Sequence, residues 1–101
     1  MPEERMTPQE AEDRLAQYAA FRWWRSGEYE HRPTWSVAQV AEALNSNGLG
    51  PASDAKVRKW IEAGQLQAVD FKPPKGLVIY REDLAIFLAT YLLPDSKQRA
   101  V

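Results

Sequence analysis

Residues 53–66, SDAKVRKWIEAGQL, are the stretch that decides the fold of this chain. Ser53 can cap a helix, because its hydroxyl can accept a hydrogen bond from a free backbone N–H of the first turn. Asp54 follows at a position where the helix dipole favours a negative charge. Gly64 stands where the left-handed C-cap conformation is least costly for glycine. The stretch therefore predicts a short helix that begins after Ser53 and ends before Gly64.

The predicted helix has an apolar side and a charged side. Three apolar residues with i, i+3 and i+4 spacing form one stripe: Val57, Trp60 and Ile61. At about 100° per residue, the opposite side and its flanks carry small and charged residues: Ala55, Lys56, Arg58, Lys59 and Glu62. Such a helix is either an ordinary amphipathic helix with a solvated face or a helix that offers three cations to a polyanion.

A second helix is predicted just upstream, over residues 36–44. Ser36 and Gln39 have capping-box spacing, and Trp35 and Val40 have the spacing of a hydrophobic staple. Apolar residues then recur at i, i+3, i+4 and i+7: Val37, Val40, Ala41 and Leu44. The intervening residues 45–52, NSNGLGPA, predict a long and flexible loop.

A hairpin and a further helix are predicted downstream. Residues 67–71 alternate between apolar and polar, as in a half-buried strand. The segment 72–76, KPPKG, predicts a turn because proline cannot continue a strand ladder, and residues 77–80, LVIY, form a second β-prone run. A helix opens at residue 81 with acids in its first turn and ends at Pro94. Its expected buried face consists of Leu84, Phe87, Leu88 and Tyr91.

In this order of elements the chain resembles the winged helix-turn-helix of excisionases and their MerR-like relatives. The segments WSVAQVAEAL, SDAKVRKWIEAGQLQAV and VIYREDLAIFL carry the resemblance, which covers about residues 35–92. It implies a small winged-helix fold, mainly α with a small β-hairpin (α+β), that binds double-stranded DNA. Carried over by position, it implies DNA contacts from the second helix and the wing: Ala55, Lys56, Arg58, Lys59, Lys72 and Lys75.

The segment that precedes the resemblance predicts an extra N-terminal helix. A helix start is indicated by Thr7 as the N-cap, Pro8 in the first turn and Glu10 as the acid of a capping box. We expect this helix to run to about Arg25. Its aromatic residues either pack on the last helix or, for Trp23 or Trp24, form a subunit or partner interface. The expected organisation is a helix and linker over 1–34, the winged domain over 35–94 and a loose tail over 95–101.

Composition excludes several classes of protein. A chain of 101 residues, 45% of them hydrophobic, suits one small domain with its own core. It has no cysteine and only His31 as histidine, so we expect no disulfide and no metal site, with His31 at the surface. The sequence contains no phosphate-binding loop or catalytic constellation, so we expect neither an enzyme nor a cofactor. No apolar run is long enough for a membrane span, and the acidic N-terminus predicts a cytoplasmic protein.

Charge is segregated along the chain. The net charge is −1, but residues 1–13 hold five acids against one arginine, a balance of −4. Residues 54–81 hold six cations against three acids, a balance of +3. A segregated positive field can steer a polyanion even when the total charge is near zero. The modest excess predicts weak and salt-sensitive DNA binding by a monomer, so specificity requires a dimer, an array or a protein partner.

Two functions are compatible with the sequence. The first is a sequence-specific DNA-binding protein of excisionase or MerR-like type, acting as a recombination directionality factor or a small transcriptional regulator, as in phage-type proteins. The second is a winged-helix module that binds a polymerase, a recombinase or another protein. The low net charge, Asp54 and the aromatic first helix favour the second function. A salt titration of DNA binding separates the two, because only the first predicts a steep dependence.

Overall fold

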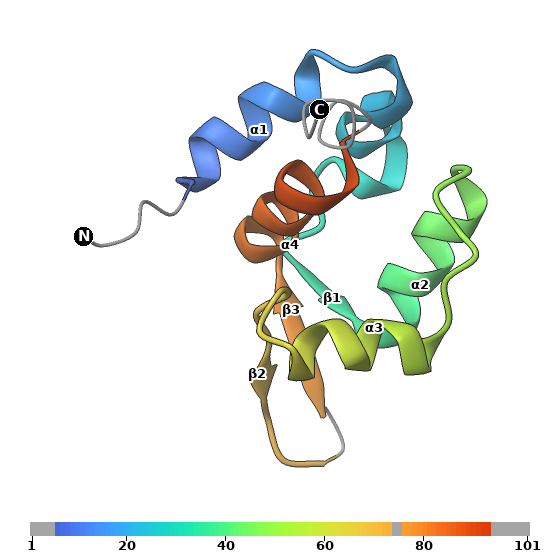
Figure 1. Cartoon of the computed structure of the whole chain (residues 1–101), viewed down its shortest axis with the longest axis vertical. Coiled ribbons are helices and arrows are strands. Elements are labelled where there is room, and N and C mark those ends of the chain that lie inside the picture. Colours follow the sequence, from blue (N-terminus) through green and yellow to red (C-terminus); the bar gives the residue numbers. More distant parts are fainter. Residues whose placement is uncertain (1–5, 74–75, 94–101) are drawn as a thin grey trace.

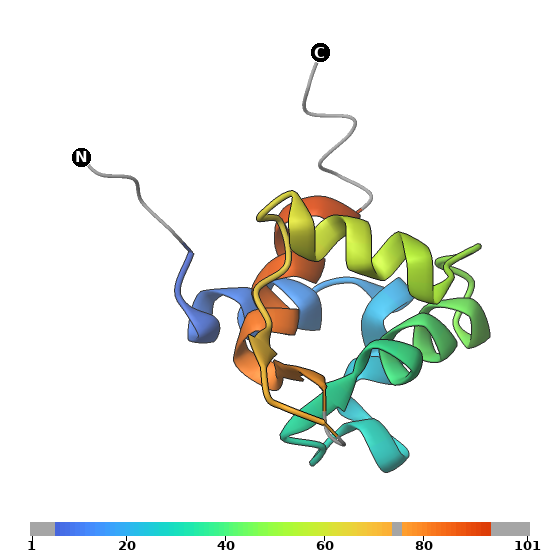
Figure 2. The same ribbon diagram turned by 90° about the horizontal axis from the view of Figure 1, so that it is seen from below.

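The chain folds as a mixed α+β protein, as the sequence predicted, in a computed structural model that describes residues 6–73 and 76–93. Its α-helices are α1 (Pro8–Ala16), α2 (Val37–Ser46), α3 (Asp54–Glu62) and α4 (Arg81–Phe87). Two 3-10 segments, η1 (Ala19–Arg25) and η2 (Gly27–Tyr29), follow α1, and a π-helical turn, η3 (Leu88–Leu92), follows α4. The strands are β1 (Thr34–Ser36), β2 (Val69–Asp70) and β3 (Leu77–Tyr80). Figure 1 and Figure 2 place α4 between α1 on one side and the α2–α3 pair on the other.

The strands form one antiparallel sheet in the order β1-β3-β2. Strand β1 was not predicted, since its residues were assigned partly to a linker. Its apolar residue Trp35 pairs with Ile79 of β3, and both side chains are buried. Strand β2 is shorter than the predicted 67–71, because its ladder with β3 holds only two pairs, Val69 with Val78 and Asp70 with Leu77.

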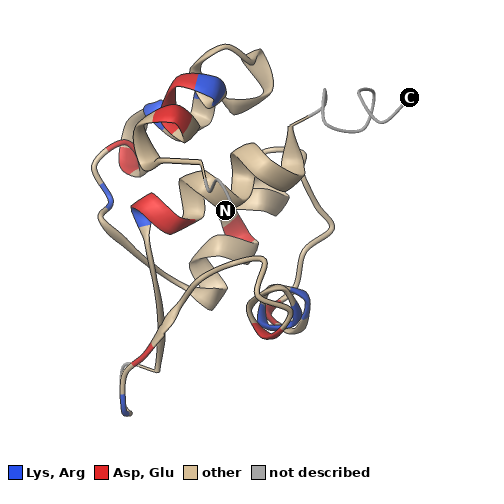
Figure 3. Ribbon diagram, turned by 60° about the vertical axis from the view of Figure 1, so that its left-hand side comes forward, with Lys and Arg blue, Asp and Glu red and all other residues tan. Residues whose placement is uncertain are grey.

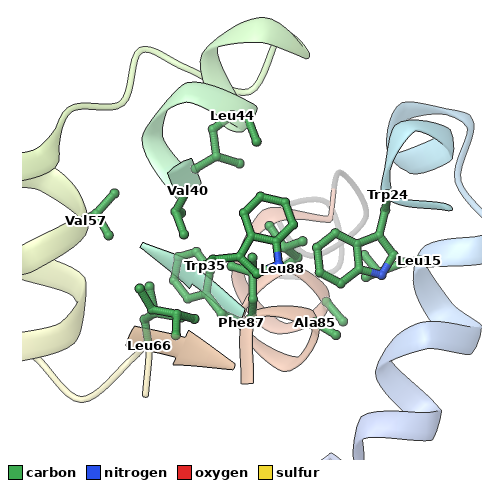
Figure 4. Close-up of a cluster of buried hydrophobic side chains, with 14 of the residues drawn as sticks. Leu15, Trp24, Trp35, Val40, Leu44, Val57, Leu66, Ala85, Phe87 and Leu88 are labelled. Atoms are coloured by element: carbon green, nitrogen blue, oxygen red, sulfur yellow. The ribbon is translucent and has the colours of Figure 1, made fainter. Parts of the chain in front are cut away.

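One hydrophobic core joins the N-terminal segment to the rest of the described chain. Figure 4 shows Trp35 near its centre, with Phe87 and Leu88 beside it. Trp24 and Leu15 approach this centre from the N-terminal segment, while side chains of α2, α3 and the following loop approach from the opposite side: Val40, Leu44, Val57 and Leu66. All of these side chains are buried, so the core spans the whole fold.

Helix α1 is shorter than predicted. Its start is as expected, because the Thr7 hydroxyl accepts from the Glu10 N–H at 3.1 Å and the Glu10 carboxylate accepts from the Thr7 N–H at 2.9 Å. The prediction of a continuous helix to about Arg25 is wrong, since α1 ends at Ala16 and Tyr18 is extended. The chain continues in the 3-10 segment η1, which is kinked at Phe21, where φ is −113° and ψ is 20°. This break lets Phe21 and Trp24 both reach the core, where neither has exposed surface.

The proposed interface role of Trp24 is also wrong. Trp24 has 0% exposed surface, and its ring stacks on Trp35 with centroids 5.8 Å apart. Trp23 is only half-buried and lies edge-on to Trp24 and Tyr29, at 5.9 and 5.3 Å. The aromatic cluster therefore belongs mainly to the intramolecular core, and an interface at Trp23 remains a prediction.

Arg81, the first residue of α4, binds the N-terminal segment. Its Nη1 donates to the Tyr29 carbonyl at 2.7 Å and its Nη2 donates to the Trp24 carbonyl at 3.2 Å. Its Nε lies 3.3 Å from the Glu12 carboxylate, which also accepts from Trp24 Nε1 at 2.8 Å. The guanidinium carbon lies 4.0 Å from the Trp24 ring centre. Arg81 therefore stabilises the fold. This corrects the prediction that its charge contributes to the positive field of residues 54–81.

The end of α4 departs from the predicted burial pattern at one residue. Leu84, Phe87 and Leu88 are buried as expected, but Tyr91 is 42% exposed. The helix widens at Leu88 into the π-helical turn η3, whose i→i+5 bonding changes the angular position of the residues that follow. The predicted stop at Pro94 lies outside the described residues. Across the described part of the chain, no helix combines the length and apolar character needed to cross a membrane.

The contacts of Arg81 predict a large effect of its removal on stability. Arg81→Ala should lower the free energy of unfolding by about 2–4 kcal/mol, because it leaves Glu12 and two backbone carbonyls without their charged donor. Arg81→Lys should recover little, since an ammonium cannot reproduce the fork of donors. Chemical denaturation measures both, with Arg22→Ala as the control: Arg22 is exposed in η1, and its removal should change stability by less than about 0.5 kcal/mol. A parental unfolding midpoint for Arg81→Ala would refute this role.

Candidate nucleic-acid interface

Helix α3 and the β2–β3 hairpin lie at the same end of the molecule (Figure 1), and Figure 2 looks onto that end. The boundaries of α3 confirm the prediction. The Ser53 hydroxyl accepts from the Lys56 N–H at 3.1 Å, and Gly64 has a φ of +82° just after the helix. Both ends are therefore set by residues within the predicted stretch.

The apolar stripe of α3 is anchored in the core. Val57 is completely buried, and Trp60 and Ile61 are half-buried against the core cluster. The Trp60 ring lies 4.8 Å from the ring of Phe87 in α4. These contacts fix the rotation of α3 about its axis, so the residues on its opposite side face solvent.

The helix residues implicated in DNA contact are all exposed: Ala55, Lys56, Arg58 and Lys59. Lys56 Nζ lies 3.3 Å from the Pro51 carbonyl and 5.8 Å from the centre of the Trp60 ring. Within the described residues, neither Arg58 nor Lys59 takes part in an ion pair or a side-chain hydrogen bond. The two cations can therefore bind an anion without breaking an internal contact.

The hairpin presents Lys72 at its exposed end. Its closure is set by Phe71, whose N–H donates to the Gly76 carbonyl at 2.9 Å, and by Gly76, whose φ is +69°. The second predicted contact, Lys75, lies outside the described residues. Figure 3 shows basic residues at the end of the hairpin and on α3. On α3, acidic residues lie among the basic ones.

A side-chain clamp spans the loop between α2 and α3, which the sequence predicted to be long and flexible. Asn45 Nδ2 donates to the Ala52 carbonyl at 2.7 Å, and Asn45 Oδ1 accepts from the Ala52 N–H at 2.8 Å. Within the loop, the half-buried Leu49 packs against the core. Composition alone could not indicate these two hydrogen bonds, because they join residues seven apart in the sequence. The clamp holds the start of α3 close to the end of α2.

The positive excess of this surface is small. With Arg81 engaged in the fold, the described part of residues 54–81 has four exposed cations: Lys56, Arg58, Lys59 and Lys72. Three exposed acids accompany them: Asp54, Glu62 and Asp70. A surface whose cations barely outnumber its acids attracts a polyanion weakly. The attraction comes from individual side chains rather than from a broad positive field.

No family model, curated protein or solved structure matches this chain. Within the described residues, no three His, Cys, Asp or Glu side chains are grouped to hold a metal ion. His31 is exposed, as predicted, and lies 3.7 Å from Glu30. The structure thus brings the predicted α3 residues and Lys72 to one end of the molecule. It adds Asn45, whose role no local sequence pattern indicated.

The Asn45 clamp predicts a measurable effect on stability. Asn45→Ala should lower the free energy of unfolding by about 1 kcal/mol, because two hydrogen bonds are lost at an exposed site where water can replace them. Ser46→Ala is the matched control, since Ser46 is exposed at the end of α2, and it should stay within about 0.5 kcal/mol of the parent. Thermal or urea unfolding gives both values. Equal stability of the Asn45 variant and the control would show that the clamp does not hold the loop in solution.

Proposed function

We propose that this chain is a winged helix-turn-helix protein that binds double-stranded DNA with sequence specificity. Helices α2 and α3 are the helix-turn-helix, the β2–β3 hairpin is the wing, and α3 enters the major groove. The observation that carries the proposal is the exposed side of α3, which carries Lys59 opposite the buried Val57 and Lys56 and Arg58 on the two flanks. A helix of this kind fits the major groove, which is wide enough to admit it.

The availability of the α3 cations for binding supports DNA as the ligand. Each phosphate that a cation neutralises releases condensed counterions, which favours binding at low salt. Arg58 and Lys59 have no ion pair to break within the described chain, so this gain is not offset by an internal loss. Lys72 at the hairpin end supplies a further cation at the same end of the molecule as α3.

The resemblance to excisionases and MerR-like proteins supports a role in DNA recombination or transcription regulation. One short helix contacts only a few base pairs, so useful specificity requires a second copy or a protein partner. Trp23, half-buried in η1, is the residue of the N-terminal segment that we propose for such a contact. We propose that the protein acts in the cytoplasm.

A second candidate function is binding of a protein partner. Val69 of β2 and Phe71, which follows β2 in the hairpin, are large hydrophobic residues with 41% and 37% of their surface exposed. Phe71 lines a groove of about 280 Å³ on the sheet, together with residues such as Val78 and Tyr80. Exposed aromatic and aliphatic side chains around a groove are typical of protein interaction surfaces.

The salt dependence of DNA binding tests the proposal directly. We expect selection from random duplexes to yield a preferred sequence, and its log affinity to fall with log salt concentration. Three or four phosphate contacts predict a slope of about −2.7 to −3.6. Fluorescence anisotropy over a range of salt concentrations measures the slope. Binding without sequence preference, or a slope near zero, would favour the protein-interaction function.

Lys59 and Lys72 should differ in how their removal affects binding. Lys59→Ala should weaken binding to the preferred duplex by about 1–3 kcal/mol and relax the preference at one position, as expected for a base contact. Lys72→Ala should weaken binding to all duplexes about equally and reduce the magnitude of the slope by roughly 0.9, as expected for one phosphate contact. Arg22→Ala, which removes an exposed cation of η1, is the control for net charge. Identical effects of all three variants would argue against a defined interface.

A further inference from the structure

The exposed side of α3 has a centre and two flanks. At about 100° per residue, Ala55, Lys59 and Glu62 lie within about 60° of one another at the centre. Arg58 and Lys56 are separated by about 160°, so one lies on each flank. Complete burial of Val57, which is about 160° from Lys59, fixes this orientation relative to the rest of the protein.

These positions predict different contacts in a DNA groove. A helix with side chains is about 10–12 Å across, close to the major-groove width of about 12 Å. Its flanks therefore approach the two phosphate backbones, while its centre faces the base edges. Cations on the flanks suit phosphates, which provide affinity without sequence information. Residues at the centre determine which bases are accepted.

Glu62 is an acid at this centre. Its side chain is exposed and forms no ion pair within the described chain, although Arg58 and Lys59 are one helical turn away. An ionised carboxylate accepts hydrogen bonds but cannot donate them. On the floor of the major groove, the donors available to it are the amino groups of cytosine N4 and adenine N6. Any other base edge leaves the charge without a partner, at a cost in free energy.

We infer that Glu62 is a specificity-determining residue that accepts a hydrogen bond from cytosine N4, an inference that rests on the proposed DNA-binding function. Lys59, three residues earlier on the same face, donates to guanine. The Cβ atoms of residues with this spacing are about 5–6 Å apart, and base pairs are about 3.4 Å apart. The two side chains therefore contact the same base pair or neighbouring ones. The recognised DNA therefore contains a G·C pair where Glu62 binds. Glu62 selects this pair by attraction to cytosine and by repulsion from other base edges.

The test measures base preference rather than affinity alone. The parent's preferred duplex and all its single-base-pair variants are compared by competition for the parent, Glu62→Ala and Glu62→Gln. We expect the parent to prefer cytosine at one position by about 5- to 150-fold, and Glu62→Ala to reduce the preference there and at no other position, because Lys59 still contacts guanine. Glu62→Gln should shift it towards adenine, because an amide can both donate and accept. Glu28→Ala, which removes an exposed acid of η2, should keep the parental profile.

Two results would overturn the inference. Tighter binding of Glu62→Ala to every duplex by a common factor would mean that Glu62 only repels phosphate. An unchanged preference at every position would place Glu62 outside the interface. Thermal unfolding of both variants confirms that they fold, which we expect because Glu62 is exposed at the end of α3. A parent that selects no duplex would instead refute the proposed function itself.

Discussion

The guanidinium group of Arg81 makes the polar contacts that connect α4 to the N-terminal segment. It lies where β3 passes directly into α4, and it binds the carbonyls of Trp24 and Tyr29 together with the carboxylate of Glu12. Trp24 and Tyr29 lie in short 3-10 segments outside the sheet, and the Tyr29 carbonyl also accepts from the Arg32 N–H at 3.3 Å. Arg81 adds a charged donor to both carbonyls, and Glu12 balances its charge in a site where both side chains are largely shielded from water, at 17% and 22% exposure.

The contacts of Arg81 and the proposed DNA-binding surface are joined through α4. Arg81 fixes the start of α4 against the N-terminal segment, and Phe87, on the same helix, packs against Trp60 of α3. From the other side, the Asn45 clamp holds the start of α3 close to α2. The orientation of the exposed face of α3 thus depends on contacts behind it, in which its cations Arg58 and Lys59 take no part.

The fold divides the basic residues between structural and surface roles. Arg81 is paired, hydrogen-bonded and placed over Trp24, whereas Arg58 is exposed on α3. Few cations remain on the proposed DNA-binding surface, and acids such as Glu62 lie among them. Electrostatic attraction alone would then give weak binding, so recognition on such a surface relies more on particular base contacts than on charge.

The sequence by itself determined α2, α3, the start of α1 and the apolar stripe of α3. These features depend on signals within about one helical turn: the caps at Thr7, Ser36 and Ser53, and the apolar periodicity. The exposed position of the predicted α3 residues followed from the same periodicity. Only the tertiary structure decided β1, the break in α1, the burial of Trp24, and the partners of Arg81 and Asn45. Each of these depends on contacts beyond a single turn, such as the pairing of Trp35 with Ile79 and the bond from Arg81 to Tyr29. The free energy of such contacts depends on which segments the core brings together, which local periodicity does not specify.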